Sequence, residues 1–174
     1  HLFRFGNALG FKVVQVEELI VDRYHVSSSV IRWLLQEGDA GEAARLLGRE
    51  YSITGQVIRG NQIGKLIGYP TANLYVDDQN KLIPSMGVYA SRVICRGKLY
   101  SGMTNIGMRP TINAHKLTIE TNIFGFDDDI YYETITVKLV KRIRNEKKFG
   151  NLDILKNQLR NDQQTALEIL DGSV

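Results

Sequence analysis

The chain has 174 residues, of which 43% are apolar and 24% are charged, and its formal net charge is +3. A chain of this length forms one domain, or one domain with a small appendage. Its 22 basic and 19 acidic residues are too evenly balanced to indicate nucleic-acid binding by themselves. No apolar run approaches the roughly 20 residues of a membrane-spanning helix, so the sequence does not predict a membrane protein.

The sequence shows no signal peptide, and Cys95, its single cysteine, cannot form an internal disulfide. We therefore expect a cytoplasmic protein. Cys95 lies within a strand-like run, where a buried structural thiol is a better interpretation than a nucleophile.

The N-terminal part of the chain predicts the end of an α/β unit followed by two short helices. Residues 10–16 read GFKVVQV and have the β-branched alternation of a strand. Ser27 precedes an apolar stripe that ends at Gly38, and Asp39 precedes a second stripe that ends at Gly48. In each case a capping residue, an apolar stripe and a terminal glycine together predict a capped helix. The strands that should precede this unit are missing from the sequence.

From Tyr51 onward the chain is rich in Val, Ile, Thr and Tyr, and its polarity mostly alternates. The turn-like sequences RGK and DDD separate these segments. Five or six strands with hairpin spacing and no intervening helix predict an antiparallel barrel rather than a parallel sheet. The predicted strands lie within residues 51–60, 86–95, 98–107, 116–126 and 131–143.

The C-terminal segment changes to a helical pattern after Asn151. Asn151 or Asp153 is expected to cap this helix. The spacing of its leucines predicts one apolar face, formed by Leu152, Leu155, Leu159, Leu167 and Leu170.

Residues 60–74 read GNQIGKLIGYPTANL, which comes close to a P-loop. A P-loop requires GxxxxGK followed by Ser or Thr, between a strand and a helix. Here the spacing is one residue short, Leu66 replaces the hydroxyl residue, and a strand-like segment follows. The P-loop interpretation is therefore excluded.

The same segment still has groups suited to a nucleotide. Gly60 and two further glycines permit turns that bring N–H groups close to phosphate oxygens, and Lys65 could neutralise phosphate charge. Thr71 and Asn73 are two residues apart in a segment that we expect to be extended, so their side chains should face the same side. Their hydroxyl and amide oxygens are suited to magnesium already bound by ATP. A flexible hairpin with a proline-stiffened exit explains the same residues without any ligand.

Two further features leave alternatives open. Glu120, inside a predicted strand, either faces solvent or serves as a base. The run from Asp127 to Asp129 predicts a solvated turn.

Residues 138–150 form the one dense basic run. It is a solvated strand end, a site for an anionic small molecule, or a nucleic-acid patch, although the last lacks interleaved aromatic residues.

In their order along the chain, these motifs resemble those of the riboflavin kinase family. The resemblance covers residues 46–162 and rests on LLGREYSITGQV, RGNQIGKLIGYPTANL, GVYA, NIGMRPT, TIETNIF, FDDDIYY and RNEKKFGNLDILKNQL. Upstream, HLFRFG and VSSSVIR resemble the end of the adenylyltransferase domain of bacterial bifunctional riboflavin kinase/FMN adenylyltransferases, also called FAD synthetases.

The resemblance implies a mainly β fold. Residues 49–174 would form a six-stranded antiparallel Greek-key barrel with a C-terminal helix. Residues 1–48 would be a remnant of an α/β nucleotidyltransferase domain with a helical linker.

The resemblance also implies a reaction, in which the γ-phosphate of ATP passes to the 5′-hydroxyl of riboflavin, giving FMN and ADP with Mg²⁺ as cofactor. The full-length parent would also adenylylate FMN to FAD. Its partners would be these small molecules, neither nucleic acid nor a membrane, with the missing adenylyltransferase domain in the same polypeptide.

The family's functional residues fall on positions that match its motifs. The catalytic base would be Glu120, and magnesium would be held by Thr71 and Asn73. ATP would contact Gly60, Lys65, Thr71, Asn73 and Tyr131. The flavin would contact Arg144, Lys147 and Phe149.

The sequence departs from the family pattern in several places. Asn122 stands where the family commonly has His, and Tyr132 where it has Gly. The N-terminal H-x-G-H motif does not occur, and Gly6 is followed directly by Asn7 where the family has a longer segment. We therefore expect that the chain is part of a larger protein.

Residues Ser27, Ser28 and Arg32 stand in a nucleotide-binding motif of the family, and a helix cap is the alternative explanation for them. Two other function classes also remain open from the sequence. One is a non-catalytic flavin- or nucleotide-binding barrel, and the other is a nucleic-acid-binding barrel of the OB type.

Overall fold

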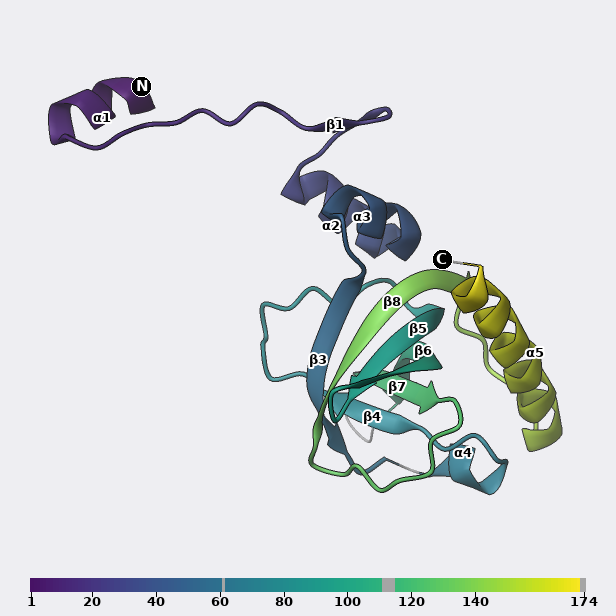
Figure 1. Cartoon of the computed structure of the whole chain (residues 1–174). Helices are drawn as coiled ribbons and strands as arrows, with labels where there is room; N and C mark the ends of the chain where they lie inside the picture. Colours follow the sequence, from purple (N-terminus) through teal and green to yellow (C-terminus); the bar gives the residue numbers. More distant parts are fainter. Residues whose placement is uncertain (61, 111–114, 173–174) are drawn as a thin grey trace.

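The computed structural model describes residues 1–60, 62–110 and 115–172, and its main body is a closed barrel of six antiparallel strands (Figure 1). The order around the barrel is β3-β4-β7-β6-β5-β8. The strands are β3 (Tyr51–Ile58), β4 (Ala72–Tyr75), β5 (Gly87–Cys95), β6 (Lys98–Pro110), β7 (His115–Ile123) and β8 (Thr134–Arg144). Because β8 returns beside β5 after the β5-β6-β7 meander, the topology is a Greek key. The predicted barrel is confirmed.

The barrel interior is mainly apolar, because alternate residues of the strands point inward and most of these residues are apolar. One buried cluster includes Ile53, Val57, Leu74, Tyr89, Val93, Ile106, Ile119, Ile135, Val137 and Leu139. Cys95 belongs to it and is 1% exposed, and burial raises the pKa of its thiol, as befits a structural cysteine.

Three buried hydroxyl groups also lie inside the barrel, on neighbouring strands. The Ser91 and Thr104 hydroxyl oxygens are 2.8 Å apart, and those of Thr104 and Thr121 are 3.0 Å apart. Each side chain is fully buried, so this chain of hydrogen bonds satisfies groups that would otherwise be costly to bury.

Helix α5 (Leu152–Asp171) packs on the outside of the barrel, against β5, β6 and β8. The Asn151 side chain caps it by accepting a hydrogen bond from the Ile154 N–H at 2.9 Å. The predicted apolar face is partly wrong, because Leu152 and Leu167 are 50% and 37% exposed. Its buried residues are Asp162, Ala166 and Leu170.

Two arginines attach α5 to the barrel. Arg144, at the end of β8, forms a bidentate ion pair with Asp162, whose side chain is 2% exposed. Arg92 on β5 donates to the Leu170 carbonyl oxygen at 3.2 Å and pairs with Glu50. The buried acid in α5 therefore faces a basic strand end, which explains why the helix does not bury a purely apolar face.

The two predicted linker helices are confirmed as α2 (Ser28–Glu37) and α3 (Ala40–Leu47). The Ser27 hydroxyl accepts from the Val30 N–H at 3.3 Å, and the Asp39 carboxylate accepts from the Glu42 N–H at 3.1 Å. Ser27 therefore serves as a helix cap, and the two helices share a small apolar core.

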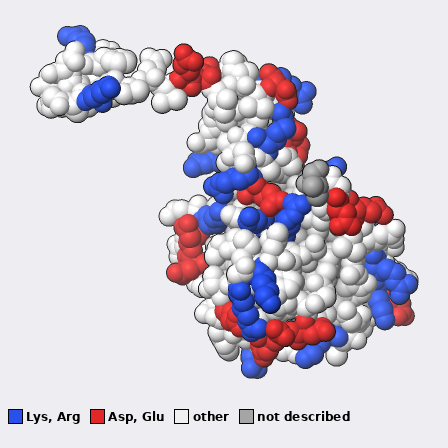
Figure 2. Space-filling view, in the orientation of Figure 1, with Lys and Arg blue, Asp and Glu red and all other residues white. Residues whose placement is uncertain are grey.

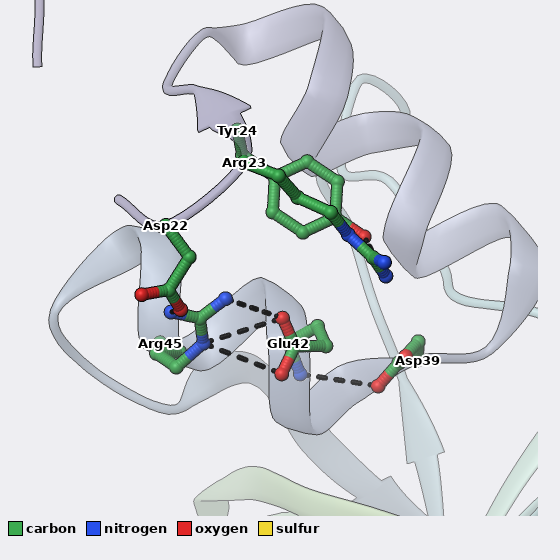
Figure 3. A network of polar contacts seen from close by, with 6 residues as sticks. All are labelled: Asp22, Arg23, Tyr24, Asp39, Glu42 and Arg45. Atoms are coloured by element: carbon green, nitrogen blue, oxygen red, sulfur yellow. Dashed lines mark hydrogen bonds and ion pairs between the residues drawn. The ribbon is translucent and has the colours of Figure 1, made fainter. Parts of the chain in front are cut away.

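The hairpin of β1 (Ile20–Val21) and β2 (Tyr24–His25) is tied to α3 by one arginine (Figure 3). Arg45 pairs with Asp22 in the hairpin turn and with Glu42, whose Oε2 lies 2.7 Å from Arg45 Nη2. The hydrogen bond from Arg45 lowers the pKa of the Glu42 carboxyl. The hairpin is thus held both by these charged contacts and by Val21 and Tyr24, which pack against the apolar core of α2 and α3.

The strand predicted for residues 10–16 is wrong. After α1 (Leu2–Leu9), which runs through Gly6 and Asn7, the described chain is irregular from Phe11 to Leu19. Val14 and Val16 are 67% and 86% exposed. This segment extends away from the barrel (Figure 1), and in the described structure it lies beside no strand that could pair with it.

Tyr132 adopts a left-handed backbone conformation, with a φ of 67°, at the position where the family pattern has glycine. We predict that Tyr132→Gly raises the free energy of unfolding by about 0.5–1 kcal/mol, because glycine adopts this conformation without strain. Urea denaturation measures the change. The control Tyr132→Ala keeps the Cβ atom and should show no such gain. An equal gain in both variants would instead implicate loss of the exposed ring.

Candidate active site

Three of the predicted site residues, Asn73, Glu120 and Arg144, lie in one row across the barrel strands. In the pairing register, Asn73 of β4 is opposite Glu120 of β7, and Glu120 is opposite Asn105 of β6. Asn105 is opposite Val88 of β5, and Val88 is opposite Arg144 of β8. Since neighbouring strands are about 4.8 Å apart, the row spans about 19 Å. The barrel therefore brings together positions that are distant in sequence.

This row lies on the outer face of the barrel. Ile119 and Thr121 point into the interior, so the alternation places Glu120 outside, where its side chain is 15% exposed. Between this face and α5 there is a cavity of about 240 Å³, which we call the central cavity. Its apolar lining includes Val88, Met103, Phe149, Leu155 and Leu159, and its polar lining includes Thr71, Asn105, Arg109, Glu120, Arg144, Glu146 and Lys147.

Glu120 forms an ion pair across the β6–β7 ladder. Its Oε1 lies 2.7 Å from Nη2 of Arg109, whose side chain is 31% exposed. The two side chains are shielded from bulk solvent more than a typical surface pair, so the contact holds the carboxylate in place. The solvent-facing interpretation of Glu120 is therefore wrong.

All three residues predicted to contact the flavin line the central cavity. Arg144 is held by Asp162 through contacts of 2.9 Å and 2.7 Å, and its guanidinium carbon is 5.6 Å from the centre of the Phe149 ring. Lys147 is exposed on the loop between them. The cavity thus combines an apolar floor, an aromatic ring and cationic groups on the side opposite Glu120.

The residues predicted to contact ATP are divided between two other cavities. Lys65, Thr71 and Tyr131 line one of about 430 Å³, and Thr71 also lines the central cavity. The Gln62 side chain donates to the Tyr131 hydroxyl at 3.4 Å, and the Arg59 guanidinium lies 5.3 Å from the Tyr131 ring centre. Thr71 therefore stands at the boundary between the two predicted substrate regions.

Gly60 and Asn73 line a third cavity of about 580 Å³. A Cβ atom on Gly60 would lie 2.8 Å from the Asn73 side-chain oxygen, so a larger residue at this position would displace the Asn73 amide. The segment that follows contains one short helix, α4 (Ile63–Leu66), where the sequence predicts only a turn. Thr71 and Asn73, which the sequence predicts to face one side, line different cavities.

Asn122 and the acidic turn have structural contacts. The Asn122 side-chain amide donates to the Pro70 carbonyl oxygen at 2.6 Å, which joins β7 to the segment leading into β4. Asp128 pairs with Arg96 at 2.8 Å, and Asp129 accepts from the Tyr131 N–H at 2.9 Å. These acids point to separate partners, and among the described residues no group of three or more His, Cys, Asp or Glu could hold a metal ion.

Sequence reasoning did not single out Asn105, Arg109 or Glu146, which also line the central cavity. A signal for two of them was present. Thr104 and Ile106 are inward-facing, so strict alternation along NIGMRPT places Asn105 and Arg109 on the outer face with Glu120. Glu146 belongs to an irregular loop, where no periodicity indicates direction.

The charged surface does not favour the nucleic-acid interpretation. Figure 2 shows basic and acidic side chains mixed over the visible face of the molecule. Within the basic run, Arg142 donates to the Glu37 carbonyl oxygen at 3.3 Å, and Arg144 is paired with Asp162. These arginines make contacts inside the protein rather than forming a free basic surface.

The comparison with known families decides which family the chain represents. Residues 47–170 match the Flavokinase family, described as riboflavin kinase. The chain belongs to the riboflavin kinase family. The match covers the barrel and nearly all of α5, so the cavities described above lie within the riboflavin kinase domain.

The riboflavin kinase domain has similar relatives in bacteria. The chain is 40% identical over 158 residues to the bifunctional riboflavin kinase/FMN adenylyltransferase of Haemophilus influenzae, covering 90% of this chain and 51% of that protein. It is 39% identical over 155 residues to the protein of the same name from Bacillus subtilis, covering 87% and 49%. The chain therefore spans about half the length of these curated relatives.

A solved structure from Streptococcus pneumoniae, described as a macrolide-efflux protein, resembles this riboflavin kinase family member in fold. Its TM-score is 0.85 at 35% identity, and the likeness covers 93% of this chain and 53% of that one. Among the described residues, no helix has the length and apolar character needed to cross a membrane. The structural likeness extends beyond the barrel, because it covers nearly the whole chain.

The Arg144–Asp162 pair gives a test of what positions the cavity wall. We predict that Asp162→Asn lowers the free energy of unfolding by about 3 kcal/mol, because Arg144 would keep a half-buried charge without its counterion. Chemical denaturation measures this value. The exposed Glu168 on the same helix offers a control, since Glu168→Gln should change it by less than about 0.5 kcal/mol. Similar losses in both variants would contradict the special role of the pair.

Proposed function

We propose that this domain is a riboflavin kinase that transfers the γ-phosphate of ATP to the 5′-hydroxyl of riboflavin, yielding FMN and ADP. The observation that carries the proposal is the position of Glu120. Its carboxylate lies on the wall of an apolar cavity, one strand away from the segment that contains Thr71 and Asn73. In this proposal the Glu120 carboxylate therefore lies between the region assigned to riboflavin and the region assigned to ATP.

Riboflavin is proposed to bind in the central cavity between the barrel and α5. The apolar side chains of Val88, Met103 and Leu159 would cover the isoalloxazine ring, with the Phe149 ring beside it. Lys147 and Arg144 would contact its polar edge. The ribityl chain would then extend toward Glu120 and Thr71, which line the polar part of the same cavity.

ATP is proposed to bind on the other side of Thr71. Gly60 and its neighbours would approach the phosphates through backbone N–H groups, Lys65 would neutralise phosphate charge, and Tyr131 would contact the nucleotide. Lys65 and Tyr131 line one cavity with Thr71, which supports this placement.

Magnesium is proposed to arrive bound to ATP. Mg²⁺ prefers oxygen ligands and usually keeps several waters and substrate phosphate oxygens, so it does not require a cage of carboxylates. The hydroxyl of Thr71 and the amide oxygen of Asn73 would supply neutral oxygen ligands of this kind, and both residues are half-buried. When bound, the ion would neutralise charge on the phosphates.

The protein's part in the reaction is positioning and one proton transfer. Glu120 takes the proton from the 5′-hydroxyl as that oxygen forms its bond to the γ-phosphorus. The bond from the γ-phosphorus to the bridging oxygen of ATP breaks, and ADP leaves with those electrons. α5 and the glycine-rich segment exclude water, which would otherwise compete as the acceptor.

The proposed domain arrangement assigns residues 1–48 to a remnant of an adenylyltransferase domain with its helical linker, and residues 49–174 to the kinase. The bifunctional names and double length of the relatives support this division. In this proposal the full-length protein also adenylylates FMN to FAD, in the cytoplasm, with small molecules rather than nucleic acid or membranes as its partners.

The test is conversion of riboflavin to FMN by the purified chain with ATP and magnesium, followed by chromatography. We predict that Glu120→Gln lowers kcat by at least about 100-fold, because the amide cannot accept the proton. Riboflavin binding, measured by quenching of its fluorescence, should change little.

Glu146→Gln is the matched control, because Glu146 lines the same cavity but is exposed on a loop. Its effect on kcat should stay below about 10-fold. Absence of FMN with the wild-type chain, with the fold intact by circular dichroism, would refute the kinase proposal and favour a non-catalytic binder. Equal losses in both variants would refute the assignment of Glu120 as the base.

Thr71 and Asn73 are tested by nucleotide binding rather than by turnover. We predict that Thr71→Ala or Asn73→Ala weakens magnesium-dependent binding of ADP by about 10-fold, because each removes one charge-assisted contact. Calorimetry with and without magnesium measures this, and Thr54→Ala, an exposed barrel residue, is the control. An equal loss in the absence of magnesium would show that these residues contact the nucleotide instead of the ion.

A further inference from the structure

Arg109 contacts Glu120 although the two residues are not register partners on β6 and β7. The register partner of Glu120 on β6 is Asn105, and Arg109 is four residues further along the same strand. At the rise of a β-strand this offset is about 13 Å between Cα atoms. The 2.7 Å contact between Arg109 Nη2 and Glu120 Oε1 therefore requires both side chains to lie extended along the outer face.

Gly107 makes room beside this ion pair for the side chains of Glu146 and Asn105. It lies between Asn105 and Arg109 on the same face of β6, because side chains alternate along a strand. A Cβ atom on Gly107 would lie 2.8 Å from the carboxyl carbon of Glu146 and 3.1 Å from the side-chain nitrogen of Asn105. Since Gly107 has no side chain, the polar groups of the central cavity can converge over it.

The contact matters because Glu120 would otherwise be free to rotate. A glutamate side chain has several rotatable bonds, and its carboxylate can face a reacting hydroxyl only in some of its orientations. The ion pair with the planar guanidinium of Arg109 fixes one carboxylate oxygen and so limits where the other can point. Both side chains are partly shielded from water, which strengthens the ion pair.

We infer that Arg109 is a positioning residue, which holds the Glu120 carboxylate in the orientation needed to accept a proton. This inference rests on the proposed function, in which Glu120 is the base. Arg109 lines both the central cavity and the cavity of Gly60 and Asn73, and in this inference it acts through its ion pair with Glu120. Its loss therefore lowers the rate of the chemical step and leaves the binding of both substrates nearly unchanged.

The experiment is a double-mutant cycle in the 174-residue chain, with Arg109→Gln, Glu120→Gln and the variant that carries both. We predict that Arg109→Gln lowers kcat by about 10- to 100-fold, because a small misplacement of a catalytic group has effects of this size. KM for riboflavin and for ATP should change by less than about 3-fold, because in this inference Arg109 acts on the orientation of Glu120 rather than on a substrate. In the Glu120→Gln background, adding Arg109→Gln should lower kcat by less than about 2-fold further, because residues that act as a unit are not additive.

Arg109→Lys is the conservative variant and should retain more activity than Arg109→Gln, because it keeps the charge but loses the planar fork. Thermal melting and riboflavin binding establish that each variant is folded. Independent, multiplicative losses in the double variant would overturn the inference and point to direct contact with the phosphate. Unchanged kcat in Arg109→Gln would also overturn it, while leaving the proposed function intact. Absence of FMN with the wild-type chain would instead overturn the proposed function.

Discussion

The closure of six antiparallel strands around a mainly apolar core is the constraint from which the site follows. Inward-facing apolar side chains fix the register of every strand, because a shift by one residue would expose half of the core. The hydrogen-bonded hydroxyls of Ser91, Thr104 and Thr121 lock three adjacent strands in the same way. Once the inner face is fixed, the outer row from Asn73 through Glu120 to Arg144 has no freedom to move.

The outer face of the barrel forms one wall of the central cavity, and α5 supplies the second wall. Its attachment combines an apolar contact with the ion pair of Arg144 and Asp162, in which both partners are largely buried. A pair of this kind specifies one docking geometry, because any other leaves a buried charge uncompensated. Arg144 therefore has two roles, as the anchor of the helix and as part of the cavity that we propose for riboflavin.

Much of this arrangement was predictable from local pattern. The strands, the capped linker helices and the C-terminal helix follow from alternation, capping residues and leucine spacing. Residues 10–16 have the pattern of a strand, yet a strand forms only where another can pair with it, and pairing is not local. Arg109 and Asp162 escaped prediction for a related reason, because each matters through a partner on another element. The resemblance to a family located Glu120 but could not show what holds it.

The alternation of β7 limits how this sequence can diverge. Inserting one residue between Ile119 and Glu120 without a compensating β-bulge would place the Glu120 carboxylate among the apolar side chains of the interior and turn Ile123 outward. Such a change removes the acid and damages the core in one step. Length variation among descendants of this sequence is therefore confined to the connections, including the glycine-rich segment before β4 and the loop before α5. New substrate preferences would arise there, while the strands keep their lengths.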